Sequence, residues 1–67
     1  MGMARPMKQI VVRKTPKGWE ANFIDNPELM SLFGTTKVMT AWTANAPAEK
    51  VIDGLQELNP DSIIILV

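Results

Sequence analysis

Alternating apolar and polar residues near the start of the chain predict a two-stranded hairpin. In residues 7–14, Ile10 and Val12 fall on one face of an extended strand. Residues 15–18, Thr-Pro-Lys-Gly, suit a tight turn, because proline presets φ at the second turn position and glycine suits the last. In residues 19–24 the larger apolar side chains again share a face, so we expect an antiparallel hairpin with one core side and one wetter side.

Helix-start residues follow this hairpin. Asn26 is suited to cap a helix, Pro27 to occupy its first position and Gly34 to end it. Apolar residues crowd the segment between them, which includes Leu29 and Phe33. We expect one or two helical turns, stabilised by packing, that cover part of the sheet.

A longer helix is predicted over residues 48–58. Its apolar side chains recur at spacings of three and four residues and form a single stripe, made of Ala48, Val51, Ile52, Leu55 and Leu58. Gly54 lies at the border of the stripe. Either its missing side chain allows a close approach of another backbone segment, or it is a tolerated defect that costs about 1 kcal/mol relative to alanine.

Two further strands are expected, one on each side of this helix. Residues 35–43 are rich in Thr, Val and Trp, and residues 63–67 are five consecutive branched apolar residues. A run that is apolar on both faces is typical of a strand buried on both sides, so we interpret residues 63–67 as the central strand. Strand, helix and strand together predict a βαβ unit with parallel strands and a right-handed crossover.

The elements define an α+β fold of order ββ(α)βαβ. We expect a small four-stranded mixed sheet with one main amphipathic helix and a short helical segment, formed by residues 7–67 as a single domain after a flexible tail of residues 1–6. The main helix covers one face of this sheet. The other face needs the short helical segment or a second subunit, which favours a homodimer. The candidate self-association residues are Ile64, Leu66, Leu29 and Phe33.

Composition limits how so small a protein is stabilised. The chain has 67 residues and contains neither cysteine nor histidine. Disulfides are thereby excluded, and we expect no metal site and no cofactor, so that oligomerisation is the remaining support for a thin core. No apolar run approaches the roughly 18 residues that cross a bilayer, and no signal-peptide pattern opens the chain. We therefore expect a cytoplasmic protein without a membrane partner.

Charge is unevenly distributed although the formal net charge is zero. Every basic residue except Lys37 and Lys50 precedes the first acidic residue, Glu20. The predicted N-terminal hairpin is therefore basic. This supports an alternative function, nucleic-acid binding, with candidate contacts Lys8, Arg13, Lys14, Lys17 and Trp19. The competing interpretation is that the lysines protect an exposed strand edge and that Trp19 belongs to the core.

A third hypothesis is a small enzyme. Histidine, cysteine and tyrosine are all absent, which leaves carboxylates such as Asp25 and Glu28 for acid-base chemistry. Both stand beside a predicted helix start, where negative charge also stabilises the helix dipole. We therefore assign no catalytic residue.

Two resemblances add to these expectations. Residues 32–36, 40–44 and 58–60 resemble small uncharacterised proteins of cyanobacterial type, a likeness that implies no activity. The order of hairpin, Asp25-Asn26-Pro27 segment, strand and amphipathic helix is similar to the HicB-like antitoxin domain. That resemblance implies a dimeric, toxin-neutralising module with a partial RNase H-like fold. The insertion formed by residues 28–37 is longer than in that family, and we transfer no functional residue from it.

The leading hypothesis is a small protein-interaction or regulatory module that acts through a sheet edge or apolar surface, on a protein partner that the sequence does not identify.

Overall fold

The hairpin forms as the alternation predicts. In the computed structural model, which describes residues 8–67, β1 (Lys8–Thr15) pairs antiparallel with β2 (Gly18–Phe23). The Thr15 hydroxyl donates a hydrogen bond of 2.8 Å to the Gly18 carbonyl and closes the turn. Gly18 has a φ of 143°, a value that few residues other than glycine adopt. The predicted tail and Met7 lie outside the described residues.

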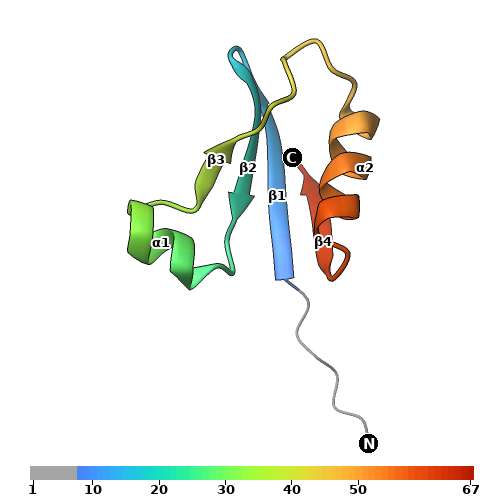
Figure 1. Cartoon of the computed structure of the whole chain (residues 1–67). Coiled ribbons are helices and arrows are strands. Elements are labelled where there is room, and N and C mark those ends of the chain that lie inside the picture. The colour runs from blue at the N-terminus through green and yellow to red at the C-terminus, as the bar shows by residue number, and fades with distance from the viewer. Residues whose placement is uncertain (1–7) are drawn as a thin grey trace, which may run out of the picture.

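Four strands make one mixed sheet in the order β3-β2-β1-β4, which confirms the predicted α+β class (Figure 1). β3 (Lys37–Met39) is antiparallel to β2, and β4 (Ser62–Leu66) is parallel to β1. It follows that β3 and β4 run in the same direction, as the βαβ prediction requires. They are not neighbours, however, because the hairpin lies between them.

The terminal apolar run is an edge strand, so its assignment as the central strand was wrong. Ile10 and Val12 of β1 are the fully buried strand residues, whereas Ile63 and Leu66 of β4 are 43% and 47% exposed. Branched side chains favour a strand wherever it lies in a sheet. Strand order depends instead on which segments pair over long distances, and the pattern of residues 63–67 does not contain that information.

The third strand is shorter than predicted. β3 has three residues, after which the chain leaves the sheet at Thr40. The backbone N–H and the hydroxyl of Thr40 both donate to the Trp19 carbonyl, at 2.9 and 2.8 Å. Trp42 is thereby carried over the helix-covered face instead of continuing the strand, and it packs against the core.

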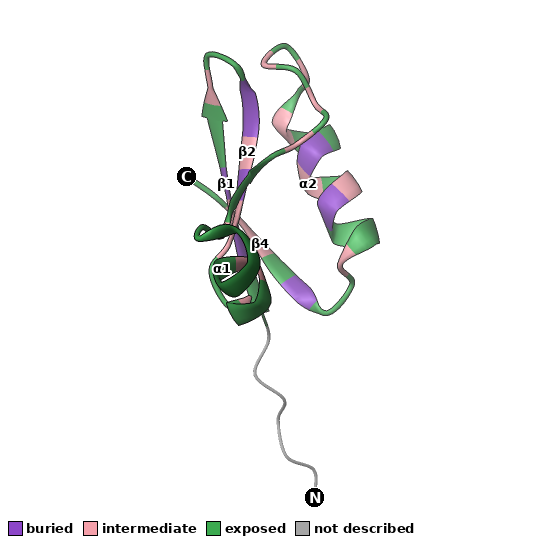
Figure 2. Ribbon diagram, turned by 60° about the vertical axis from the view of Figure 1, so that its left-hand side comes forward, coloured by how far each residue is buried: buried purple, intermediate pink, exposed green. Residues whose placement is uncertain are grey.

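α2 (Ala48–Leu58) covers one face of the sheet with most of the predicted apolar stripe (Figure 2). Leu58, which was expected in this stripe, is instead 74% exposed at the end of the helix. Val51 and Leu55 are its buried residues, and they meet the buried side chains of the hairpin. The buried core consists of Ile10, Val12, Trp19, Ala21, Val51 and Leu55. No helix in residues 8–67 is long and apolar enough to cross a membrane.

Gly54 is the point where α2 and the Trp42 ring meet. A Cβ atom at this position would lie 2.6 Å from Cη2 of Trp42, well inside van der Waals contact. Gly54 therefore does allow a close approach, as the first interpretation expected, but the group that approaches is the Trp42 side chain and not another backbone segment.

α1 (Pro27–Phe33) begins and ends as predicted. The Leu29 N–H donates to Oδ1 of Asn26 at 3.1 Å, and Gly34, with a φ of 73°, donates its N–H to the Met30 carbonyl at 2.9 Å. The expected role of the helix was wrong, because none of its residues is buried. α1 lies beside the β3 edge of the sheet instead of covering a face (Figure 1).

Candidate interaction surfaces

The outer side of β4 presents unpaired backbone groups. The Val67 N–H donates to the Val12 carbonyl at 3.0 Å, which fixes the direction of the strand's polar groups. Because these groups alternate along a strand, those of Ile63 and Ile65 also face β1, whereas those of Ile64 and Leu66 point away from it. β4 has β1 as its one neighbour in the described sheet. The N–H and C=O groups of Ile64 and Leu66 therefore face outward. We call the side of the strand that carries them the β4 edge.

Ser62 differs from the other outward-facing residues because its backbone groups are occupied. Its N–H donates to the Asn59 carbonyl at 3.0 Å, and its carbonyl accepts from Nε2 of Gln56 at 2.9 Å. The end of α2 thus closes the start of the edge. The part of β4 that is available to another strand is centred on Ile65.

The face of the sheet opposite α2, here called the open face, carries an apolar stripe along β1 and β4. Val11 pairs with Ile65 in the register, and Ile63 and Val67 lie on the same face by alternation. Ile63 is 43% exposed and Val67 70%. Within residues 8–67 the helix that packs on the sheet is α2, which leaves this stripe uncovered (Figure 2).

The predicted self-association residues of β4 both lie on the side of the sheet that faces α2. The Ile64 side chain packs against the core on the α2 side, and Leu66 shares that side. Leu66 is nevertheless 47% exposed at the sheet edge, whereas Ile63, Ile65 and Val67 lie on the open face, where Ile65 is half-buried. The sequence contained the signal, because alternation separates these two sets, but it did not show which set faces the helix.

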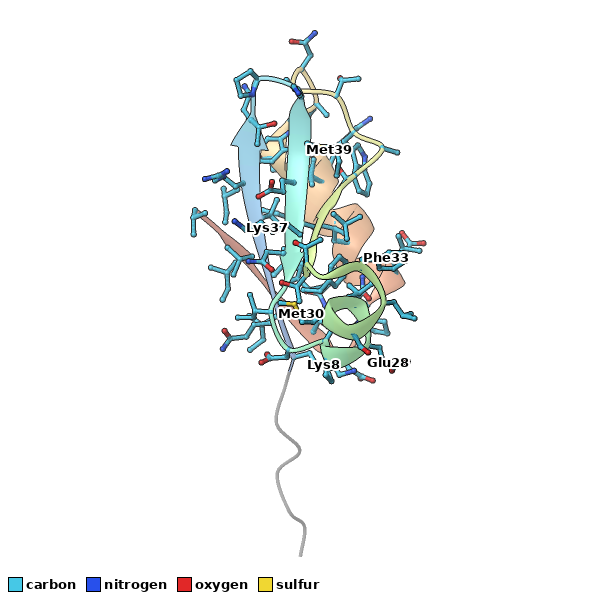
Figure 3. The ribbon with its side chains drawn as sticks, turned by 90° about the vertical axis from the view of Figure 1, so that its left-hand side faces the viewer. Lys8, Glu28, Met30, Phe33, Lys37 and Met39 are labelled. Carbon is cyan, nitrogen blue, oxygen red and sulfur yellow. The ribbon has the colours of Figure 1, made fainter. Side chains whose placement is uncertain are left out.

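A second apolar surface lies at the opposite edge of the sheet. Met30, Phe33 and Met39 are 52%, 69% and 48% exposed, and Figure 3 looks onto the edge that they share. The exposed apolar residues of this edge, here called the α1–β3 surface, are Met30, Leu32, Phe33, Val38 and Met39; by alternation Val38 and Met39 point to opposite faces of the sheet. Of the two residues predicted here, Phe33 belongs to this surface, whereas Leu29 is half-buried. The sequence indicated this exposed surface through the crowding of apolar residues on a very short helix, because a helix of so few turns cannot bury all of them.

The candidate nucleic-acid contacts are not brought together. Lys8 begins β1, whereas Lys14 and Lys17 lie at the hairpin turn, so Lys8 and Lys14 are roughly 20 Å apart along the strand. Arg13 points to the open face, where its guanidinium lies 3.8 Å from the Glu20 carboxylate. These basic side chains therefore form no continuous stripe.

Trp19 belongs to the core. Its side chain is buried, with a relative exposure of 5%, and its Nε1–H donates to the Ala46 carbonyl at 3.0 Å. With so little of its surface exposed, the ring is not available to stack on a base.

A pocket of about 70 Å³ lies where β1 and β4 begin, and Asp25 lines it together with Lys8, Asn26 and Ser62. Small-molecule sites usually enclose about 300 Å³ or more. One Asp25 carboxylate oxygen accepts the Gln9 N–H at 3.0 Å, which gives this side chain a structural role at the end of the hairpin. Within residues 8–67, no three or more acidic, histidine or cysteine side chains gather in a group that could hold a metal ion.

Comparisons of the chain with protein-family models, with curated proteins and with solved structures find no match. The resemblance to the HicB-like antitoxin domain therefore stays a prediction, and functional conclusions depend on the surfaces described above.

Proposed function

We propose that this chain is a small homodimeric protein-interaction module that acts through apolar surfaces at the two edges of its sheet. One observation carries the proposal: a chain of 67 residues leaves large apolar side chains exposed on both sheet edges. They are Met30, Leu32, Phe33, Val38 and Met39 on one edge and Ile63, Leu66 and Val67 on the other.

The energetic reason is the free energy of apolar burial. Covering one such side chain is worth about 1.5–3 kcal/mol, whereas the net stability of a small domain is only about 0.05–0.15 kcal/mol per residue. Large apolar patches on soluble proteins usually mark protein interfaces. An interface that covers either surface would thus add stability comparable with that of the fold.

The two surfaces differ in charge, which supports different occupants. Residues 62–67 contain no charged side chain, so the β4 edge suits a second apolar strand. Charged residues flank the α1–β3 surface, with Glu28 on α1 and Lys37 on β3 (Figure 3). Such a polar rim around an apolar centre suits a different protein whose own charges are complementary. In this proposal, self-association uses β4 and a protein partner binds α1 and β3.

Serine substitution of Leu32 and Phe33 together tests the partner surface. These side chains are 73% and 69% exposed, so the free energy of unfolding should change by less than about 0.5 kcal/mol in urea titrations followed by circular dichroism. Binding of the protein partner, isolated from an extract of the source organism and then purified, should weaken tenfold or more in calorimetry, since central apolar anchors each contribute above about 1 kcal/mol.

Leu58→Ser is the matched control for this experiment. Leu58 is 74% exposed at the end of α2, outside both surfaces, so its replacement should leave the affinity unchanged. Equal losses of affinity for the partner in Leu58→Ser and in the double variant would indicate non-specific binding and contradict the proposed surface. A sample that is monomeric throughout the micromolar range in analytical ultracentrifugation would contradict the homodimer.

Nucleic-acid binding remains the alternative function and receives less support. The basic side chains lie at two ends of β1 and on two faces, and Trp19 is buried. A gel shift of DNA or RNA at about 50 mM salt, abolished by Lys14→Gln with Lys17→Gln, would favour this alternative over the proposed one.

A further inference from the structure

We infer that a second copy of this chain binds at the β4 edge, with the two β4 strands antiparallel and the twofold axis passing through Ile65. The two four-stranded sheets would then form one continuous sheet. This inference rests on the proposed homodimer and deepens it, because it specifies which atoms meet and in which register.

The backbone supplies the first argument. In an antiparallel pair, residues directly opposite each other exchange two hydrogen bonds at every second position. A twofold axis at Ile65 places Ile64 opposite Leu66 of the second copy, and Leu66 opposite Ile64 of the second copy. These are the residues whose N–H and C=O groups point outward, as the Val67 to Val12 hydrogen bond requires. All of their free groups find partners in this one register.

Ser62 excludes the neighbouring register. An axis through Ile64 would place Ser62 opposite Leu66 of the second copy. Both backbone groups of Ser62 are already bonded, the N–H to Asn59 at 3.0 Å and the carbonyl to Gln56 at 2.9 Å. Pairing there would require these bonds to break, whereas the Ile65 register leaves them intact.

Side chains on the open face supply the second argument. At a pair without hydrogen bonds the side chains lie closest, and the axis places Ile65 against Ile65 of the second copy in such a pair. Ile63 would lie opposite Val67 of the second copy. Their exposed fractions, 43% and 70%, would fall, and the stripes that run from Val11 on each sheet would merge.

Charge agrees with the symmetric arrangement. Exposed edge strands are usually protected by lysine, proline or a bulge, but residues 62–67 contain no charge and no proline. Asp61 lies outside the paired stretch, so the axis places no two charged side chains opposite each other. Pairing over so few residues covers less than the roughly 800 Å² per partner of a standard interface, and we therefore expect a dissociation constant in the micromolar range.

Cysteine cross-linking tests the register, because the chain has no cysteine of its own. The thiol introduced by Ile65→Cys would meet its own copy at the axis, within the 4.4–6.8 Å Cα separation of disulfides (about 4.5 Å at such a pair). With a mild oxidant at micromolar concentration, this variant should form a covalent dimer at least ten times faster than Ile63→Cys. In the control the two thiols would be about 14 Å apart along the paired strands.

A mixture of Ile63→Cys and Val67→Cys chains supplies a positive control, since these positions oppose each other and should form a mixed dimer. Faster oxidation of Ile63→Cys than of Ile65→Cys would overturn the register. Faster oxidation of Ile64→Cys would place the axis at Ile64 and likewise overturn it.

Leu66→Pro tests the role of the backbone. Proline removes an N–H that faces away from β1, so the pairing of β1 and β4 should persist, while a hydrogen bond to the second copy is lost and the ring blocks its approach. We expect self-association at least tenfold weaker than in Leu66→Ala by ultracentrifugation, with an unchanged circular dichroism spectrum. Wild-type self-association in the proline variant would contradict the edge pairing but leave a homodimer through another surface. If the proline variant unfolds, the cross-linking rates decide.

Discussion

Replacing Trp19 with alanine should lower the free energy of unfolding by about 3–5 kcal/mol, which approaches the whole stability expected for a domain of this length. The side chain is 5% exposed and fills the space between the hairpin and the segment that leads into α2. Its loss would leave a cavity, and it would also leave the Ala46 carbonyl without the Nε1–H donor.

Trp19 is also joined to the following segment through its backbone. Its N–H donates to the Trp42 carbonyl at 3.3 Å, and its carbonyl accepts two hydrogen bonds from Thr40. Because these hydrogen bonds hold the surrounding backbone in place, the structure should relax little after the side chain is removed. The cavity should therefore remain largely unfilled, which places the expected loss of stability in the upper part of the range.

Urea denaturation followed by far-ultraviolet circular dichroism measures this effect without relying on tryptophan fluorescence. Trp19→Phe is the control: it keeps an aromatic ring and loses the hydrogen bond, so the cost should be about 1–2 kcal/mol. A cost below about 1 kcal/mol for alanine would contradict core placement, and it would return Trp19 to the candidates for nucleic-acid contact.

Gly54→Ala should destabilise the fold by up to about 2 kcal/mol even though alanine favours helices. The gain in helix propensity is about 1 kcal/mol, whereas overpacking a filled site costs about 1–3 kcal/mol. The new methyl group would lie 2.6 Å from Cη2 of Trp42, so the ring would have to leave the helix surface. Overpacking is therefore expected to exceed the propensity gain.

The same substitution in a Trp42→Ala background should have the opposite sign. With the ring removed, only the propensity remains, and Gly54→Ala should stabilise by about 0.5–1 kcal/mol. Thermal and urea unfolding of the four proteins in this cycle measure the coupling between the two positions. Stabilisation by Gly54→Ala in the wild-type background would show that the Trp42 ring moves aside at little cost.

Local structure followed from short-range chemistry, and the sequence predicted it well. The turn at Gly18, the Asn26 cap, the Gly34 helix end and the apolar stripe of α2 each depend on residues a few positions apart. Such interactions are encoded in neighbouring residues, so alternation and spacing were sufficient to locate both helices and the hairpin.

Arrangement in space was less predictable, and residues 63–67 show why. Their branched side chains fit a central strand and an apolar edge strand equally well, because β preference measures packing on a pleated surface and not position in the sheet. The decisive fact was that the fully buried Ile10 and Val12 occupy the strand next to them, which no pattern within the run itself reveals. For the same reason, alternation within the run separates its two faces but does not show which of them faces α2.

Only part of the α1–β3 surface was expected from the sequence. Phe33 was expected either to cover the sheet or to take part in self-association. The structure instead holds α1 beside the short strand β3, on the far side of the hairpin from β4. A helix of seven residues has too few turns for its periodicity to show which side faces the sheet.

The pairing of β1 with β4 has a consequence for the order in which the protein folds. Lys8 aligns with Ser62, so this ladder joins segments more than fifty residues apart, whereas the hairpin closes through a turn of a few residues. Loop closure over the longer distance costs more entropy and slows folding. We therefore expect the hairpin to form early and the docking of β4 to limit the refolding rate. During synthesis on the ribosome, the edge of β1 that pairs with β4 would remain unpaired until residues 62–66 emerge. In that interval the nascent chain would be most prone to aggregate and to bind chaperones.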